Sequence, residues 1–299
     1  MFDINVPDGT YIVAVSGGVD SVSLLHALVN TYDVKTHTFI VAHYDHGIRG
    51  DSYTDRSLVK ELAHSHGVPF VYSEGRLGEH ASEDTARTAR YAFLHEAKRA
   101  AKAKAIITAH HHDDKRETIV HNVLRGTGRQ GVQSLQSSAE ILRPLLHVSK
   151  SELYDYAKTH SLEWKEDQTN KDTRYKRNYI RHTLLSKLSE DQNRQLQTHI
   201  KNIQAINNEI DALIINVLHA QKNKSSLDRE LIISLPHVVA KELLVMWLRQ
   251  NGIRSFQKKN IEQLIVAIKT AQSGSQHDIV AGHQLKLTDN LVTLVRPKR

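Results

Sequence analysis

The sequence contains no cysteine. Disulfide bonds, cysteine-ligated zinc and a thiol nucleophile are therefore excluded, and so is a mechanism in which the protein carries sulfur on one of its own cysteines. The sequence also lacks any apolar run approaching the roughly 20 residues that a membrane-spanning helix needs. Residues 1–10 lack the basic stretch and apolar core of a signal peptide. Together these absences predict a cytoplasmic protein with no membrane partner.

The composition is that of a globular protein large enough for two domains. The chain has 299 residues, of which 39% are hydrophobic and 24% are charged, and these fractions are ordinary for a folded protein. The formal net charge is +7. A basic surface suits a polyanionic partner such as nucleic acid, although positive charge can equally serve only solubility.

Short apolar runs alternate with helical patterns along the first half of the sequence. The runs have the length and composition of buried strands, and the segments between them carry apolar residues at helical spacing. The expected strands are residues 11–15, 38–42, 69–72, 105–109 and 141–146, and the expected helices are residues 20–31, 51–66, 83–102, 113–125 and 149–160. This alternation predicts an α/β domain with a parallel sheet covered on both faces.

The strand pattern is expected to stop near Leu188. Beyond it, residues 191–220, 236–250 and 257–271 have helical patterns, and residues 278–296 are expected to form a terminal hairpin that turns at Thr288-Asp289-Asn290. The sequence therefore predicts two domains, a parallel-sheet domain over residues 1–188 and a smaller, mainly helical domain over residues 189–299.

The segment Ser16-Gly17-Gly18-Val19-Asp20-Ser21 lies between the first expected strand and the first expected helix. Ligands of open parallel sheets bind at the carboxyl ends of strands. At such a place the two glycines let backbone N–H groups approach an anion, the helix N-terminus adds donors, and both serines can donate hydroxyl hydrogen bonds. A carboxylate repels phosphate, so Asp20 is expected to hold a Mg²⁺ ion that bridges to the phosphates.

A Gly-Gly pair alone would more often be only a tight turn before a capped helix. The full order of strand, Ser-Gly-Gly-x-Asp-Ser and helix is more specific, and the loop lacks the Gly-Lys-Ser/Thr ending of a Walker loop. The loop resembles the PP-loop of the N-type ATP pyrophosphatases, which cleave ATP to AMP and pyrophosphate. The resemblance implies an adenine nucleotide alpha hydrolase-like domain that uses ATP to adenylate a carbonyl-like oxygen on its acceptor.

Further motifs follow in order along the chain. They are His43-Tyr44-Asp45-His46-Gly47-Ile48-Arg49, Ala86-Arg87-Thr88-Ala89-Arg90-Tyr91-Ala92-Phe93, Ala109-His110-His111-His112-Asp113-Asp114-Lys115-Arg116-Glu117-Thr118, Arg143-Pro144-Leu145 and Glu166-Asp167-Gln168-Thr169-Asn170, with Tyr175, Arg177, Asn178, Ile180 and Arg181 behind them. This ordered set resembles the tRNA(Ile)-lysidine synthetases over roughly residues 1–190. The helical remainder is similar in pattern to the family's substrate-binding domain.

The resemblance implies a reaction and its partners. The family adenylates O2 of the wobble cytidine in an isoleucine tRNA with a CAU anticodon, and the side-chain amine of free lysine then attacks C2 to give lysidine. The implied cofactors are ATP and Mg²⁺, and the implied partners are that tRNA and L-lysine. The family's longer members carry a further C-terminal domain that helps to grip the acceptor stem, so the sequence resembles the shorter form or is truncated. The sequence leaves a homodimer open.

Asp114 and Glu117 are three residues apart on an expected helix and therefore share a face. A lysine amine has a pKa near 10.4 and must lose a proton before it attacks, which calls for nearby carboxylates. By resemblance, Asp114 and Glu117 bind the amine and help to deprotonate it. Taken alone they would more often be first-turn carboxylates that complement the helix dipole, and Asp113 is more often a helix cap.

The resemblance also implies roles for basic side chains. Arg177 and Arg181 lie one helical turn apart, and contacts with the lysine carboxylate, the ATP phosphates and the tRNA backbone all stay open for them; Arg177 is placed among the catalytic residues. His43 and His110 are expected at the nucleotide, although a lone histidine is more often structural. Arg87, Arg90, Asn178 and Arg181 are expected at the tRNA, although a solvated helix surface would also carry such charges.

Other functions remain alternatives. A relative with the same loop could act on a different acceptor, and a non-catalytic tRNA-binding protein could keep an inactive ATP fold. His43, Asp45, His46 and residues 110–114 are also plausible ligands for a metal-dependent phosphohydrolase, which would leave residues 16–21 unexplained. Two positions depart from the family's usual pattern, with Lys115 in place of glutamine and Ser186 in place of proline.

Overall fold

The computed structural model describes residues 2–47, 52–75, 77–78, 82–166, 176–221, 223–253, 256–280 and 282–296. Motif residues Ile48, Arg49, 167–170 and Tyr175 lie outside the described residues. The chain divides into two compact units, Met1–Thr198 and His199–Arg299, where the sequence predicted a boundary at residue 188. None of the helices in the described ranges is long and apolar enough to cross a membrane.

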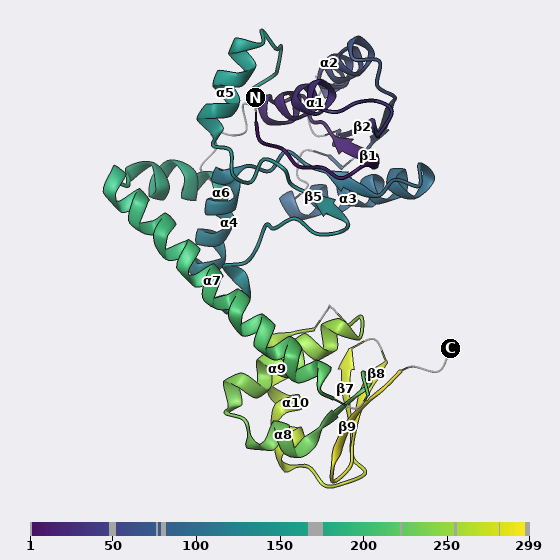
Figure 1. The fold of residues 1–299 in the computed structure, drawn as a ribbon, viewed down its shortest axis with the longest axis vertical. Helices are drawn as coiled ribbons and strands as arrows, with labels where there is room; N and C mark the ends of the chain where they lie inside the picture. Colours follow the sequence, from purple (N-terminus) through teal and green to yellow (C-terminus); the bar gives the residue numbers. More distant parts are fainter. Residues whose placement is uncertain are drawn as a thin grey trace. The chain divides into compact units, whose positions relative to one another are not determined.

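The first unit is built on a five-stranded parallel sheet with the order β3-β2-β1-β4-β5 (Figure 1). Its strands are β1 (Gly9–Ala14), β2 (His37–Asp45), β3 (Phe70–Glu74), β4 (Ala105–Ile107) and β5 (Ile141–Leu142). Its longer helices are α1 (Val19–Thr31), α2 (Ser52–Ser65), α3 (Glu83–Ala100), α4 (His112–Leu124) and α5 (Lys150–Thr159). The predicted α/β fold class and the alternation of strands with helices are confirmed.

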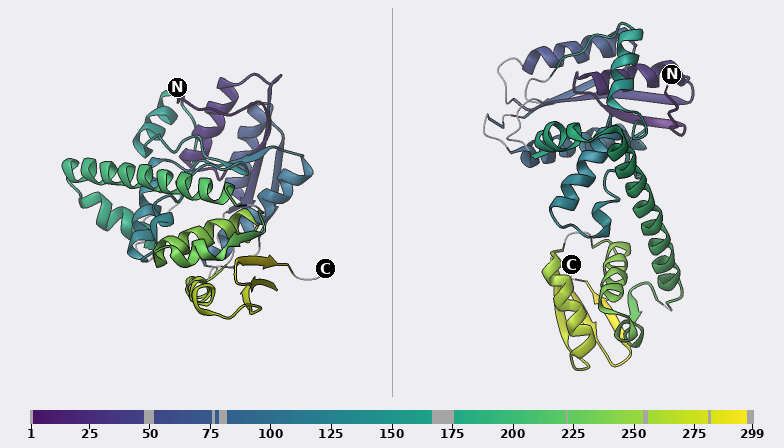
Figure 2. Two further views of the ribbon diagram at one scale, coloured as in Figure 1. Left: turned by 60° about the horizontal axis from the view of Figure 1, so that its bottom comes forward. Right: turned by 90° about the vertical axis from the view of Figure 1, so that its left-hand side faces the viewer.

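The two faces of the sheet are covered by different helices (Figure 2). Leu28 of α1, Val59 of α2 and Leu153 of α5 pack in one apolar cluster with Val13 of β1. The neighbouring residue Ile12 belongs to a second cluster, which contains Leu94 of α3. Since successive side chains of a strand point to opposite faces, a β1 that is apolar at both positions is buried on both sides.

The order of the strands reverses at β1, because the chain runs outward through β2 and β3 and then returns to β4 on the other side. The carboxyl ends of β1 and β4 therefore flank a topological switch point, where open parallel sheets bind their ligands. The fifth strand is shorter than the predicted 141–146, because Pro144 has no N–H to donate to a sheet and residues 143–146 turn instead.

Short helical elements connect the sheet to the long helix α7 (Glu190–His219). They are α6 (Lys176–Tyr179), a π-helical turn η3 (Ile180–Leu184) and the 3₁₀ turn η4 (Leu185–Lys187). A further 3₁₀ turn, η1 (Arg129–Gly131), lies earlier in the chain, between α4 and β5. Single π-helical turns occur frequently at functional sites, and η3 contains Arg181.

The second unit combines helices with an antiparallel sheet of order β6-β9-β8-β7. Its elements are β6 (Ser226–Asp228), α8 (Arg229–Ser234), α9 (His237–Gln250), α10 (Lys258–Thr270), β7 (Gln276–Val280), β8 (His283–Leu287) and β9 (Leu291–Val295). The predicted hairpin with its turn at residues 288–290 is confirmed as β8 and β9. The sequence prediction placed no strand at β6 and did not separate β7 from the hairpin, whereas these two strands complete a sheet over the core around Trp247 and Leu285.

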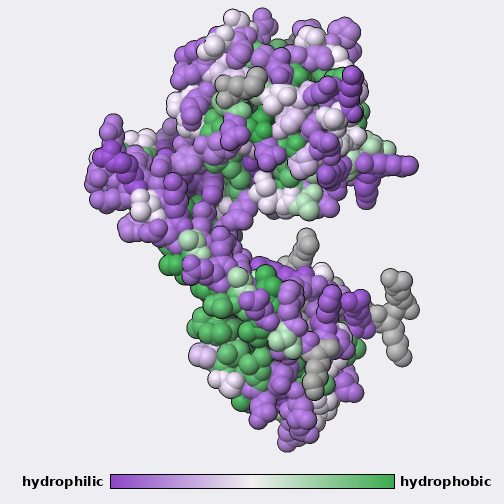
Figure 3. All heavy atoms as spheres, in the orientation of Figure 1, coloured by the Kyte–Doolittle hydropathy of each residue, from purple (hydrophilic) through white to green (hydrophobic). Residues whose placement is uncertain are grey.

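Apolar side chains are exposed on the second unit, as the green area in the lower part of Figure 3 shows. The large exposed apolar residues of this unit are Ile203, Ile206, Leu213, Val217, Ile233, Val238, Val239, Val266 and Leu291. Exposed apolar areas of this kind are typical of surfaces that meet other molecules.

Candidate nucleotide and substrate site

The segment that follows β1 forms a closed loop before α1. Gly17 has φ +94°, a left-handed conformation that favours glycine, and Gly18 is the N-cap of α1. The Ser21 hydroxyl donates to the Gly18 carbonyl at 3.0 Å and accepts from the Ser16 N–H at 3.1 Å. These bonds hold the two ends of the loop together, so residues 16–21 form one closed loop at a helix N-terminus, a geometry that suits the binding of an anion.

Lys165, in the segment that follows α5, contacts the loop through its backbone. The backbone N–H of Lys165 donates to the Gly17 carbonyl at 3.0 Å. The Lys165 ammonium lies 3.4 Å from the Asp55 carboxylate and contacts the Thr54 hydroxyl, both on α2. The charge of Lys165 is therefore directed to α2.

His43 lies at the carboxyl end of β2, beneath the loop. It is buried, and its Nδ1 donates to the Val15 carbonyl at 2.9 Å. Burial lowers the pKa of His43, so the ring is neutral and ties β2 to β1. The predicted contact of His43 with the nucleotide stays a prediction, whereas its hydrogen bond to Val15 is part of the fold.

Residues 108–114, which follow β4, line the switch point on the side opposite the phosphate loop. His111, not Asp113, is the N-cap of α4: its Nδ1 accepts from the Asp113 N–H at 3.2 Å, and the Asp114 carboxylate accepts from the His111 N–H at 3.1 Å. Asp113 instead accepts from the backbone N–H of Lys150 at 2.8 Å and so contacts the first turn of α5, whose N-cap is Ser149. The two helix N-termini are thereby locked together.

Asp114 and Glu117 meet the same guanidinium. The Arg181 Nε and Nη2 donate to the Glu117 carboxylate at 2.5 and 2.9 Å, and Nη2 lies 3.7 Å from Asp114 Oδ1. Glu117 is buried, and burial raises its pKa while Arg181 opposes that shift. Burial lowers the pKa of Arg181, but Glu117 and the neighbouring carboxylates outweigh it and leave that pKa raised.

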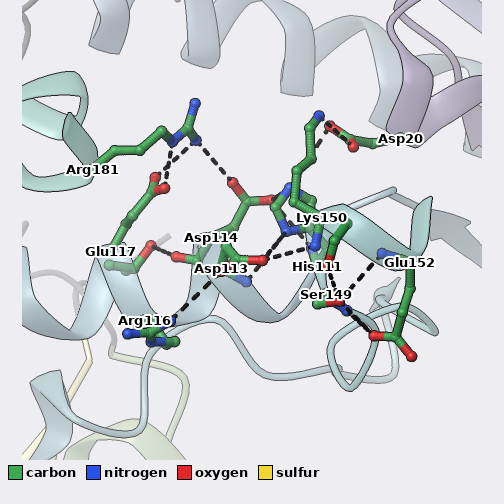
Figure 4. A network of polar contacts seen from close by, with 12 residues as sticks. Asp20, His111, Asp113, Asp114, Arg116, Glu117, Ser149, Lys150, Glu152 and Arg181 are labelled. Carbon is green, nitrogen blue, oxygen red and sulfur yellow. Dashed lines mark hydrogen bonds and ion pairs between the residues drawn. The ribbon is translucent and has the colours of Figure 1, made fainter. Parts of the chain in front are cut away.

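Asp20 of the phosphate loop contacts residues at the N-termini of both α4 and α5 (Figure 4). Its Oδ1 lies 2.6 Å from the Lys150 ammonium and its Oδ2 lies 3.7 Å from His111 Nε2, which is 3.4 Å from Asp114 Oδ2. A chain of polar contacts thus runs from Lys150 and Asp20 at the phosphate loop, through His111, to Asp114 and the Arg181 pair. Sequence reasoning missed Lys150 and His111. The sequence did contain a hint for Lys150. A cation in the first turn of a helix opposes the helix dipole, so a lysine there suggests a role other than stabilising the helix.

His110 lies where several positive charges converge. Its Nδ1 is 2.8 Å from the Thr108 hydroxyl. Burial lowers the pKa of His110 to about 3, and positive charges assist, so the ring is neutral. The contributing guanidinium groups are those of Arg143, Arg87, Arg90 and Arg177. The predicted basic residues Arg87, Arg90 and Arg177, which come from two separate motifs, thus lie around one histidine. Arg143 of a third motif joins them, and the sequence had predicted no role for it.

A cavity of about 1480 Å³ opens between the phosphate loop and the residues that follow β4. Its lining includes both serines and both glycines of the loop together with Asp20, His43, Arg90, His110, Asp114, Glu117, Lys150 and Arg181. Of the predicted site residues, Arg87, Arg177 and Asn178 do not line it, and Asn178 is buried. Pockets for a single ligand usually measure about 300–1,000 Å³, so this cavity has room for more than one substrate.

The described residues contain no group of three or more His, Asp and Glu side chains that could hold a metal ion by themselves. His43 is directed to Val15, and the Asp45 carboxylate accepts from the Gly47 N–H at 2.9 Å. The geometry therefore gives no support to the ligand set of a metal-dependent phosphohydrolase. Asp20 and Asp55 lie beside the phosphate loop, and the Asp55 carboxylate is paired with Lys165.

Known proteins resemble this chain over part of its length. The tRNA(Ile)-lysidine synthase of Exiguobacterium sibiricum is 39% identical over 194 residues, which cover 63% of this chain and 46% of that protein. The same-named enzyme of Solibacter usitatus is 39% identical over 60% of this chain and 41% of its own. The bifunctional protein TilS/HprT of Listeria monocytogenes is 30% identical over 78% of this chain and 38% of its own. The chain thus spans less than half the length of these relatives.

A solved structure resembles the fold at low sequence identity. The U34-tRNA thiolase NcsA from Methanococcus maripaludis matches 67% of this chain and 74% of its own, with a TM-score of 0.53 and 14% identity. At that identity the likeness concerns the fold alone. The sequence model of the PP-loop domain matches residues 3–188, which is more than half of the chain. The chain therefore belongs to the PP-loop domain family.

Proposed function

We propose that this protein ligates lysine to C2 of the wobble cytidine of a CAU-anticodon tRNA(Ile), through an O2-adenylated intermediate, and releases AMP and pyrophosphate. The observation that carries the proposal is that the phosphate loop and the Asp114–Glu117 pair face one cavity. A nucleotide and an amine can thus meet there. The named relatives, which are lysidine synthases, agree with this chemistry.

In the proposed first step the loop holds the ATP phosphates. Backbone N–H groups at Gly17 and Gly18 and the hydroxyl of Ser16 are the donors, and the Ser21 hydroxyl would join them by turning away from the Gly18 carbonyl. Mg²⁺ commonly binds one or two carboxylates together with substrate phosphates, and Asp20, half-buried beside the loop, fits that pattern. When bound, the ion would neutralise charge on the phosphates. The cytosine O2 attacks the α-phosphorus, and pyrophosphate leaves with the electron pair of the broken P–O bond.

In the proposed second step the lysine amine attacks C2 and AMP leaves with the electron pair of the C–O bond. The amine arrives as an ammonium ion and must lose protons to the carboxylates of Asp114 and Glu117. Arg181 occupies this pair in the present structure. We infer that the guanidinium shares or gives up these oxygens when the substrate ammonium binds, and then has charge available for a phosphate or the lysine carboxylate.

The distribution of charge supports a nucleic-acid role for the second unit. Residues 199–299 contain 14 Lys and Arg against 8 Asp and Glu, so they carry most of the net charge of +7. Basic domains of this kind bind polyanions, and a tRNA substrate agrees with the cytoplasmic location expected from the sequence.

Arg87, Arg90 and Arg177 are proposed as further tRNA or phosphate contacts. The residues proposed for the reaction all belong to a single chain.

A direct assay tests the proposal. The protein is incubated with ATP, Mg²⁺, labelled lysine and a tRNA(Ile) transcript with the CAU anticodon, and a matched transcript with uridine at the wobble position serves as control. We expect ATP-dependent labelling of the first transcript alone, with pyrophosphate released. ATP cleavage that depends on another acceptor would favour the alternative of a different substrate. Phosphoester hydrolysis without ATP would contradict the adenylation chemistry altogether.

A further inference from the structure

The ammonium of Lys150 lies 2.6 Å from the Asp20 carboxylate, on the cavity side of the phosphate loop (Figure 4). Its other close neighbour is the ring of Tyr154, whose centroid is 5.1 Å away. The proposed catalytic steps give Lys150 no role. Its partner, however, is the carboxylate proposed to hold the Mg²⁺ ion of the nucleotide.

Lys150 stands at the first position of α5, where a cation is electrostatically unfavourable because the helix dipole is positive there. The position is nevertheless fixed firmly. Ser149 and Glu152 form a capping box, and the Lys150 backbone N–H donates to Asp113 of α4. The fold thus holds a lysine beside the phosphate loop against the preference of its helix, which is typical of a position kept for function rather than stability.

The phosphate loop needs a cation that it does not contain. ATP brings several negative charges, and residues 16–21 contribute only the negative charge of Asp20. Among the described residues, a second lysine beside the loop, Lys165, is directed to Asp55 and Thr54 on α2. Lys150 lines the cavity and has a flexible four-carbon stem that lets its ammonium move away from Asp20.

Building on the proposed function, we propose that Lys150 is a phosphate-binding residue of this site. It rests on Asp20 when no nucleotide is bound, and it contacts the β- and γ-phosphates when a divalent cation takes its place at that carboxylate. There it stabilises the negative charge of pyrophosphate as the α–β bond breaks, and it transfers no proton. Lys150 therefore supplies, from α5, the positive charge that a lysine within the loop itself supplies in a Walker loop.

Equilibrium binding of pyrophosphate and of AMP, measured by calorimetry with Mg²⁺ present, separates this role from a structural one. We expect Lys150→Met to weaken binding of pyrophosphate roughly 10- to 100-fold, the usual effect of losing a charged hydrogen bond. AMP lacks both distal phosphates, so its binding should change by less than about twofold. Lys150→Arg keeps the charge and should bind pyrophosphate far better than Lys150→Met. The control is Lys158→Met, an exposed lysine in the last turn of the same helix.

Two outcomes would overturn the inference. One is a Lys150→Met variant that binds pyrophosphate as tightly as the unaltered protein. The other is an equal loss of AMP and pyrophosphate binding, which would assign Lys150 to the structure of the loop. If the unaltered protein binds neither ATP nor pyrophosphate, the proposed function itself fails, so the two failures are distinguishable.

Discussion

The guanidinium of Arg181 donates two hydrogen bonds to the Glu117 carboxylate, of 2.5 and 2.9 Å. Glu117 is 3% exposed at its side chain and Arg181 is 35% exposed, so the pair joins the buried face of α4 to the solvent-facing turn η3. A bidentate pair of this kind is among the stronger charged contacts in proteins. It fixes η3 against the sheet domain and, at the same time, fills the carboxylate pair proposed for the substrate amine.

Breaking this pair from one side should destabilise the first unit. Glu117→Leu leaves the Arg181 charge without its main partner, and loss of one member of a buried pair costs about 3–5 kcal/mol. Because Arg181 is one-third exposed and water can solvate it, we expect about 2 kcal/mol in urea unfolding. The double variant Glu117→Leu/Arg181→Met should recover part of that loss. Simple addition of the two single effects would show that the pair contributes nothing.

Removing the Asp114 charge should separate the two proposed half-reactions. Asp114→Asn cannot take a proton from the lysine ammonium, and loss of a general base commonly lowers a rate by about 10²–10⁴-fold. We therefore expect lysine incorporation to fall at least 100-fold while adenylation of the tRNA, followed as lysine-independent pyrophosphate release, continues.

The matched control for that variant is Asp113→Asn. Asp113 accepts a hydrogen bond from the Lys150 backbone, and an asparagine oxygen can accept the same bond. Lysine incorporation by Asp113→Asn should therefore stay near normal. Equal losses in both variants would contradict the assignment of the amine to Asp114.

The sequence predicted the sheet domain well because its signals are local. Apolar runs of strand length followed by helical spacing identify β1, β2, β3 and β4 without any knowledge of distant residues. The loop at residues 16–21 and the charges of α4 were likewise visible, because parallel strands deliver their carboxyl ends to one edge.

What the sequence did not predict depends on contacts between distant segments. Lys150 and Asp20 are 130 residues apart, and no spacing rule connects them. His111 stood in a run of three histidines, and only the structure distinguishes the one that caps α4 from the one that lies among arginines. The strands β6 and β7 escaped notice because β6 has three residues and β7 mixes polar and apolar ones, so both are stabilised by the completed sheet.

Two adjacent glycines of the phosphate loop should differ sharply when replaced by alanine. Gly17 has φ +94°, and a left-handed conformation costs a residue with a Cβ about 1–2 kcal/mol. Gly18 has φ −77°, and a Cβ there would meet its nearest atom at 3.8 Å, an ordinary contact. We expect Gly17→Ala to lower the free energy of unfolding by about 1–2 kcal/mol and to weaken ATP binding. Gly18→Ala should leave stability near normal, and similar losses in both would exclude backbone strain as the cause.

The lowered pKa of His110 should appear in the pH dependence of stability. Burial and the nearby arginines lower this pKa from 6.5 to about 3, so between these values the unfolded chain binds a proton that the folded protein excludes. The contribution is fully present above pH 6.5 and is lost as the pH falls toward 3. Its slope reaches at most about 1.4 kcal/mol per pH unit.

The variant His110→Asn removes that titration. Asparagine can keep a polar contact with the Thr108 hydroxyl but does not ionise. We therefore expect urea unfolding measured at pH 7, 6 and 5 to show a flatter loss of stability in His110→Asn than in the unaltered protein. Other buried histidines, such as His43, titrate in both proteins and cancel from the difference. An unchanged slope in His110→Asn would mean that His110 accepts its proton as readily in the folded protein as in the unfolded chain, and the surrounding arginines would then have to lie farther from the ring.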